Sequence, residues 1–301
     1  MTIKFPIKLF FTILFFFSIN LSFAQSKYQK DFSKFWTAIN NHYAYLDQQN
    51  IDWKKVKEIY EPKAKKISND QEFIQLLEIA LNELHNGHSS LNTNLNSSNR
   101  LIPSGSDFYV EKVGNKFFVA DLRKGFGADL SGMKIGMEVT KFNGKPIDEQ
   151  LKKFLPKFTN QHNPKMYQYA IDMLFAGTYD VEREITAVEN GKSKTYKPVS
   201  YRNRDELLYS KIINDKTAYI KINNSLGNNA LISEFDKTLD SFFQHKNLII
   251  DLTETPSGGN STVARAIMGR FTTKLLPYQI HEFDEKEYET KRHWTEFVTP
   301  R

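Results

Sequence analysis

The stretch Leu248–Ser261 constrains this chain more than any other part of its sequence. It begins with the aliphatic run Leu248–Leu252, which predicts a short buried strand. The residues that follow are rich in proline and glycine and predict a tight turn. Asn260 or Ser261 would then cap a helix over Thr262–Phe271.

Two consecutive glycines, Gly258 and Gly259, lie in this turn. Glycine lets the backbone approach a bound group closely, and the free N–H groups at the start of the helix add the positive end of the helix dipole. Such a turn can stabilise a developing oxyanion. It is equally typical of a purely structural connection from strand to helix, and the turn alone leaves both interpretations open.

Residues 1–24 have the composition of a secretory signal peptide. Lys4 and Lys8 precede the apolar run Leu9–Phe17, and the small residues Ser22 and Ala24 occupy the positions before a cleavage site. We expect cleavage after Ala24 and export to a periplasm or an extracellular space. The alternative is an uncleaved membrane anchor, for which the apolar run is short.

The composition excludes several other classes. The chain has no cysteine, which rules out a lipidated cysteine, disulfides, thiolate metal sites and a cysteine nucleophile. The net charge of +6 comes from basic residues interleaved with acidic ones, so we expect no nucleic-acid partner. A mean hydropathy of −0.52 argues against further membrane spans. No motif suggests a cofactor or a metal.

The periodicity of the sequence predicts a multidomain α/β chain. Residues 25–100 predict a helical N-terminal domain, because apolar residues recur every three or four positions. Residues 101–200 predict a β-rich module with two helices and a hairpin. Residues 201–301 alternate strands with helices, which predicts a parallel sheet with crossover helices. The polar stretch Asn92–Arg100 is expected to be a linker.

The first expected helix carries Phe32, Phe35, Trp36, Ile39 and Tyr43 on one face. The other expected helices are Asp52–Lys66 with Asp52 as N-cap, a third capped by Asn69 or Asp70, Pro146–Phe158, Met166–Phe175 and Asn228–Gln244. The expected strands are Phe108–Val113, Lys116–Leu122, Met137–Phe142, Val181–Val188, Lys194–Pro198, Leu207–Ile213, Thr217–Ile222, Leu248–Leu252, Gln279–Phe283 and His293–Val298.

A histidine lies just beyond the end of the third expected helix, within Leu84–Leu91. His88 follows Gly87, and an imidazole at an exposed turn can act as a general base because its ordinary pKa is near neutral. A solvated histidine at a helix end explains the same pattern. His85 and His88 make a weak zinc motif, since the glutamate of such motifs is missing.

Gly125, Phe126 and Gly127 form a second glycine motif, followed by Gly132. The spacing differs from that of a dinucleotide-binding fingerprint, and a turn and a strand follow where that fingerprint has a long helix. We therefore do not expect a phosphate site there.

Taken together, three segments resemble the S41 family of serine peptidases, the C-terminal processing and tricorn-core group, and particularly its secreted Bacteroidetes members. Leu84–Leu91 resembles "L-x-D-G-H-[ST]-x-L", and Gly125–Ile147 resembles the second half of a PDZ-like domain. Tyr219–Ile222 with Leu248–Phe271 resembles the family's strand and "D-[LI]-R-x-N-x-G-G-[NS]" turn. The match covers residues 30–300, and the order of the segments is more specific than any one of them.

The resemblance implies a helical domain, a PDZ-like module and an α/β catalytic domain of ClpP/crotonase-like fold. It implies that His88 is the general base and that the amides of Gly258 and Gly259 line an oxyanion hole. In the implied reaction a serine hydroxyl attacks a peptide carbonyl, and the histidine takes its proton.

The resemblance also implies that the PDZ-like module binds a peptide by strand addition, with Gly125, Phe126 and Gly127 among the substrate-binding residues. The expected partner is therefore a peptide or an unfolded protein. The oligomeric state is not predicted.

Three positions depart from the family pattern. Asn86 stands where the family has aspartate, Thr253 replaces an arginine, and Met137 replaces an aspartate. These differences leave the expected fold unchanged and put the details of the site in doubt.

The family's nucleophilic serine motif, "S-x-[GA]-E", has no counterpart before Arg301. From this we expect a fragment with an incomplete catalytic domain and no peptidase activity of its own. Ser89, Ser90, Ser257 and Ser261 offer hydroxyls but are better explained as turn and cap residues. The main alternative is an inactive exported protein that binds peptide C-termini, and a weaker one is an exported esterase.

Overall fold

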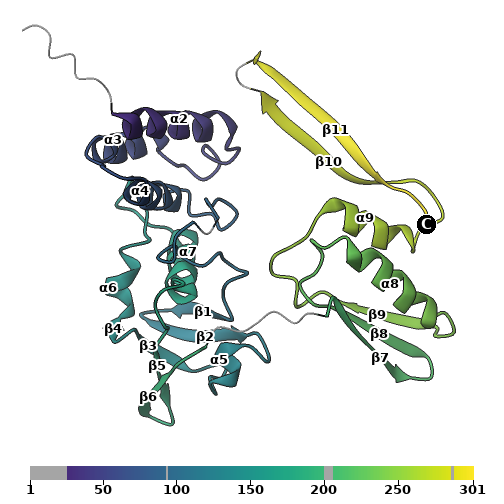
Figure 1. The fold of residues 1–301 in the computed structure, drawn as a ribbon. Coiled ribbons are helices and arrows are strands. Elements are labelled where there is room, and N and C mark those ends of the chain that lie inside the picture. The colour runs from purple at the N-terminus through teal and green to yellow at the C-terminus, as the bar shows by residue number, and fades with distance from the viewer. Residues whose placement is uncertain (1–25, 93, 200–205, 286–287) are drawn as a thin grey trace, which may run out of the picture.

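The structure is a computed structural model that describes residues 26–92, 94–199, 206–285 and 288–301 (Figure 1). The expected signal peptide and the expected boundary at residues 200/201 lie outside these ranges. The described chain mixes helices with three β-sheets, and its buried apolar residues form three separate clusters. No helix of the described residues is long and apolar enough to span a membrane.

Three helices form the first part: α2 (Lys27–His42), α3 (Trp53–Ala64) and α4 (Asp70–Asn82). The sequence predicted each of them. Asp52 is the N-cap of α3 as expected, and Asn69 is the N-cap of α4, for which Asn69 or Asp70 was expected; each side chain accepts from the backbone N–H three residues later. Their cluster includes the fully buried Phe32, Val56, Tyr60, Ala64, Ala80 and Leu84.

The second part is a six-stranded antiparallel sheet in the order β1-β2-β3-β5-β6, with β4 paired to β3. Its strands are β1 (Phe108–Val113), β2 (Lys116–Leu122), β3 (Glu138–Phe142), β4 (Lys145–Pro146), β5 (Ile185–Glu189) and β6 (Lys192–Tyr196). Three helices accompany it: α5 (Gly127–Leu130), α6 (Ile147–Leu151) and α7 (Pro164–Ala176). Strand β1 is an edge strand, and α7 runs beside it (Figure 1).

Helix α6 is shorter than the helix expected over Pro146–Phe158. After Leu151 the chain continues in turns, and Pro156 could not have continued the helix, because proline lacks an N–H and disfavours helix at the preceding residue. The backbone amides of Lys157 and Phe158 donate to the buried carboxylate of Glu83, at 2.7 and 3.2 Å. This contact fixes the helical part against the sheet region.

The polar stretch Asn92–Arg100 is packed, unlike the linker expected from its composition. The side chain of Ser98 is buried and donates to Glu78, while Asn99 forms a β-bridge with Thr178. Its C-terminal half therefore has partners on α4 and beyond α7, whereas Asn92, Asn94 and Asn96 are exposed.

The third part contains a three-stranded sheet in the order β7-β8-β9, made of β7 (Leu208–Asn214), β8 (Thr217–Ile222) and β9 (Asn247–Asp251). Helix α8 (Ala230–Ser241) connects β8 to β9, and these two strands are parallel as predicted. The sheet is nevertheless mixed, because the short turn from β7 to β8 makes that pair antiparallel.

Helix α9 (Ser261–Gly269) follows the glycine turn and packs with α8 on one face of the sheet, where Phe235 of α8 shares a buried cluster with Ile220 and Ile222 of β8. A long hairpin, β10 (Leu276–Glu285) with β11 (Thr290–Val298), extends from this part. Its tip region reaches back to α2, where Phe283 stacks on His42 with ring centroids 6.1 Å apart.

Candidate functional site

The loop after α4, called here the histidine loop, holds His88 in an exposed position. Part of this loop is an Asx turn, since Oδ1 of Asn86 accepts from the backbone N–H of His88 at 2.9 Å. Nδ2 of Asn86 donates to the hydroxyl of Tyr43 at 2.8 Å, which ties the loop to the end of α2. No described residue forms a hydrogen bond with the His88 imidazole.

His85 lies in the same loop and has a different environment. Its φ of 37° turns the chain after α4, and its Nδ1 lies 3.2 Å from the carbonyl oxygen of Glu83. Burial lowers the pKa of His85. A ring held against its own backbone suits a structural role better than that of a base.

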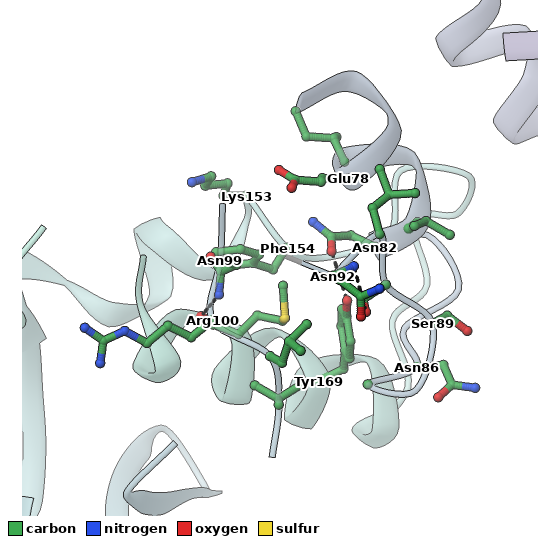
Figure 2. Close-up of a pocket in the computed structure, with 18 of the residues that line it drawn as sticks. Glu78, Asn82, Asn86, Ser89, Asn92, Asn99, Arg100, Lys153, Phe154 and Tyr169 are labelled. Atoms are coloured by element: carbon green, nitrogen blue, oxygen red, sulfur yellow. Dashed lines mark hydrogen bonds between the residues drawn. The ribbon is translucent and has the colours of Figure 1, made fainter. Parts of the chain in front are cut away.

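A cavity of about 340 Å³ borders the histidine loop (Figure 2). Asn82, Asn86, Asn99 and Tyr169 are among its lining residues, and Tyr169 donates to Oδ1 of Asn82 at 2.9 Å (Figure 2). Gly87 and Ser89 also line it, whereas His88 between them does not.

The glycine turn is ordered by hydrogen bonds at its start. Asp251, the last residue of β9, accepts from the N–H and hydroxyl of Thr253 at 2.8 and 2.6 Å and from the hydroxyl of Tyr219. The Thr253 hydroxyl, the Tyr219 hydroxyl and the Thr253 amide together lower the pKa of Asp251 to about 2. Thr253, which departs from the family's arginine, therefore shapes the turn.

The two glycine amides differ. Gly258 has a φ of +65°, which favours glycine, and its N–H donates to the carbonyl of Thr255 at 3.0 Å. None of the described residues accepts from the N–H of Gly259. Asn260 caps α9 as predicted, since its Oδ1 accepts from Val263 N–H at 2.9 Å. Of the two expected oxyanion donors, one is engaged within the turn.

The histidine loop and the glycine turn approach the same short segment from two directions. A Cβ placed on Gly87 would lie 3.0 Å from Cγ1 of Ile102. Ile102 and Pro103 also line a second cavity, of about 210 Å³, whose wall includes Pro256 of the glycine turn. No hydrogen bond or ring contact of the described residues joins His88 directly to the glycines.

The motif Gly125, Phe126 and Gly127 lies at the start of α5, and its first two amides already have acceptors. Gly125 N–H donates to Asp129 at 2.7 Å, and Phe126 N–H donates to the carbonyl of Arg123 at 3.1 Å. Gly127 is buried, and a Cβ there would lie 2.1 Å from the carbonyl oxygen of Val199. The third position thus needs glycine for packing.

Arg123 connects this motif to the glycine turn. Its guanidinium lies over the ring of Phe126, 3.7 Å from the ring centroid, and Nη2 is 3.2 Å from the carboxylate of Glu254. This contact could not be predicted from sequence patterns, because the two charged residues are 131 positions apart.

The remaining hydroxyls have turn or cap roles. Ser257 exchanges two hydrogen bonds with Asn224, both 3.0 Å long, and Ser261 is the first residue of α9. Ser89 donates its N–H to the carbonyl of Asn86, and the hydroxyl of Ser90 accepts from the N–H of Asn92. Across the described ranges, no group of three histidine or acidic residues is placed to hold a metal.

One family model and several solved structures match parts of this chain. The Tricorn protease C1 domain family matches residues 24–82. Mature CPAF complexed with lactacystin aligns at a TM-score of 0.50 with 14% identity, over 86% of this chain and 62% of that one. Mature CPAF aligns at a TM-score of 0.49 with 14% identity, over 86% of this chain and 61% of that one. The photosystem II D1 C-terminal processing protease aligns at a TM-score of 0.48 with 12% identity, over 92% of this chain and 71% of that one.

The chain thus spans between 60% and 62% of the length of the CPAF chains that it matches. No curated protein sequence matches it significantly. At such low identity the structural likeness concerns the fold, and it shows that the described chain has the mixed helix-and-sheet fold found in mature CPAF.

Proposed function

We propose that this chain is part of an exported serine-type peptidase of the S41 class, which hydrolyses peptide bonds in peptides or unfolded proteins in a periplasm or outside the cell. His88 is the general base, and the amides of Gly258 and Gly259 stabilise the oxyanion. The observation that carries the proposal is that the histidine loop and the glycine turn both border the Ile102–Pro103 segment.

In this proposal a PDZ-like module holds the substrate. Strand β1 has no partner strand on one side, and a cavity lined by residues of β1 and α7, among them Glu111 and Tyr167, lies there. An added strand would displace Nε2 of Gln168, which donates to the carbonyl of Val110 at 2.9 Å. The substrate-binding role of Gly125, Phe126 and Gly127 then depends on the Phe126 ring and on the packing of the motif. Their amides contribute less, because those of Gly125 and Phe126 already donate within the protein.

Opening of the turn would complete the oxyanion site. The N–H of Gly258 must leave the carbonyl of Thr255 before it can donate to a substrate, whereas the N–H of Gly259 needs no such change. An exposed His88 ring is likewise accessible to a nucleophile that approaches from solvent.

The test is cleavage of unfolded casein by the natural gene product that contains these residues, followed on gels. We expect His88→Ala to reduce cleavage by roughly 10³-fold. The matched control is His293→Ala on β11, an exposed histidine outside the site, which should cleave like the wild type. Equal cleavage by the wild type and His88→Ala would refute the role of His88.

The second candidate is an exported protein that binds peptides without chemistry. It is favoured by the engaged Gly258 amide and by the lack of a bonded partner for the His88 ring among the described residues. Under this alternative, fluorescently labelled peptides bind, casein stays intact, and His88→Ala binds peptide with unchanged affinity.

A further inference from the structure

A carboxylate without a counter-charge lines the cavity between α7, β1 and the glycine turn. This cavity has a volume of about 210 Å³, and its wall includes Asp172, Tyr109, Thr253 and Pro256. Within the described ranges Asp172 takes part in no ion pair. Its one hydrogen bond comes from Nε2 of Gln168, at 2.8 Å.

Gln168 holds Asp172 in place. Its Nε2 also donates to the backbone carbonyl of Val110 in β1, at 2.9 Å, so the amide bridges the strand and the carboxylate. Burial nevertheless raises the pKa of Asp172 to about 6, which leaves the group mostly ionised at neutral pH. A half-buried, ionised carboxylate is costly unless a cation completes its environment.

The one arginine in the wall, Arg123, does not supply that cation. Its guanidinium is paired with Glu254 at 3.2 Å and lies over the ring of Phe126. The wall also contains Asp121, a second carboxylate. The cavity therefore has an excess of negative charge.

The size of the cavity fits one long side chain. Small-molecule sites usually measure roughly 300–1,000 Å³, so about 210 Å³ is small for an entire ligand. Ile102, Phe108 and Leu122 provide apolar wall, which suits the methylene stem of a lysine or arginine whose charged end reaches a carboxylate.

We infer that this cavity, through Asp172, selects a lysine or arginine side chain of a peptide bound along β1. The inference rests on the proposed function, which supplies the peptide. Since Thr253 and Pro256 belong to the same wall, the bound side chain would touch the loop that holds the two glycines. A peptide's terminal carboxylate would be repelled from this cavity.

The first test uses three labelled peptides of alanine and valine that differ only at the central residue: lysine, norleucine or glutamate. By fluorescence anisotropy we expect the wild type to bind the lysine peptide about tenfold tighter than the norleucine peptide. Asp172→Asn should remove this preference, and Asp172→Lys should favour the glutamate peptide.

The matched control is Asp215→Asn, an exposed carboxylate in the turn between β7 and β8, which should keep the preference for lysine. Circular dichroism confirms that each variant is folded. Absence of a lysine preference in the wild type, or its persistence in Asp172→Asn, overturns the inference.

The second test separates the cavity from the peptide groove. Carboxyl ¹³C NMR of the wild type is recorded with n-butylammonium, the end of a lysine side chain, and with n-butanol. We expect a saturable shift of the Asp172 signal with butylammonium only. If butylammonium binds but no peptide does, the cavity is a cation site and the peptide groove along β1 is refuted. If butylammonium does not shift the Asp172 signal, the inference is overturned.

Discussion

Nη2 of Arg123 lies 3.2 Å from the carboxylate of Glu254, and both side chains are largely buried. This ion pair joins the end of β2 to the loop that holds the two glycines. The guanidinium also stacks on Phe126, so three segments that are distant in sequence meet at one side chain.

Breaking this ion pair should destabilise the protein and make the glycine turn more mobile. Because removal of one partner leaves the other charge largely buried, we expect Glu254→Gln to lower the free energy of unfolding by about 1–2 kcal/mol. Urea unfolding measures this change, and amide hydrogen exchange of residues 252–260 should become faster. A double-mutant cycle with Arg123→Met isolates the pair; unchanged exchange in the loop would contradict the prediction.

A stronger effect is expected at Asp107. Its two carboxylate oxygens accept from Nη1 and Nη2 of Arg183 at 2.7 and 3.0 Å, and one of them also accepts from the N–H of Ala128. Both charged side chains are buried, so Asp107→Ala should cost about 3–5 kcal/mol in urea unfolding. Asp148→Ala, at an exposed ion pair, should change stability by less than about 1 kcal/mol.

The folded protein should become more stable when Asp172 is neutral. The pKa of this group rises from 3.8 to about 6 on folding, so the folded state binds its proton more tightly. The contribution of Asp172 to stability therefore falls as the pH rises from about 4 to about 6.

Asp172→Asn should remove this cost and raise the free energy of unfolding at pH 7 by about 1–2 kcal/mol, allowing for partial exposure. Urea unfolding at several pH values between 4 and 7 should show a smaller gain toward pH 4. A variant that is less stable than the wild type at pH 7 would contradict this expectation.

Binding of the lysine peptide should weaken as the pH falls through about 6, because the proton competes with the cation for Asp172. Between pH 7 and pH 5 we expect an affinity loss of about tenfold. Tyr109 also faces the cavity, but its raised pKa keeps it neutral throughout this range. The other charged groups of the wall are Asp121 and Arg123, and Arg123 is paired with Glu254 outside the wall. Asp121→Asn should keep the same pH dependence in anisotropy titrations.

Asn86 should matter for the position of His88. Asn86→Ala removes both the acceptor for the His88 N–H and the donor to Tyr43, which should cost about 1–2 kcal/mol. Asn86→Asp keeps an acceptor for the amide, and the Tyr43 hydroxyl, which donates to Gln49 at 3.3 Å, can exchange this long bond for one to the new carboxylate. We therefore expect stability near that of the wild type and an unchanged NMR signal of the His88 ring in Asn86→Asp, and an altered signal in Asn86→Ala.

The helices and strands were predicted well from sequence because local patterns determine them. Asp52, Asn69 and Asn260 are N-caps as expected, and the hairpin Phe108–Leu122 has the expected strands. The helix expected to reach Phe158 ends at Leu151, and the chain beyond it is held by a long-range contact, since Glu83 accepts from the N–H of Phe158.

The candidate site could be anticipated only as separate motifs. Composition and spacing single out His88, Gly258 and Gly259, but they carry no information about the Ile102–Pro103 segment between the two loops. The sequence around Asp172 did not indicate a site either, because a single acidic residue on a helix is normally solvated. Its environment depends on β1 and on the glycine turn, which lies about 80 positions later in the chain.

Gly259 has a neighbour that matters for any mutational study of this turn. A Cβ at this position would lie 2.4 Å from Cβ of Leu226 and 2.6 Å from the carbonyl oxygen of Leu226. An alanine there keeps the N–H but must displace the β8–α8 connection, so inactivity of that variant reports steric damage. Replacing the peptide N–H with an ester oxygen by semisynthesis changes the donor alone, and it is the substitution that isolates hydrogen bonding from space filling.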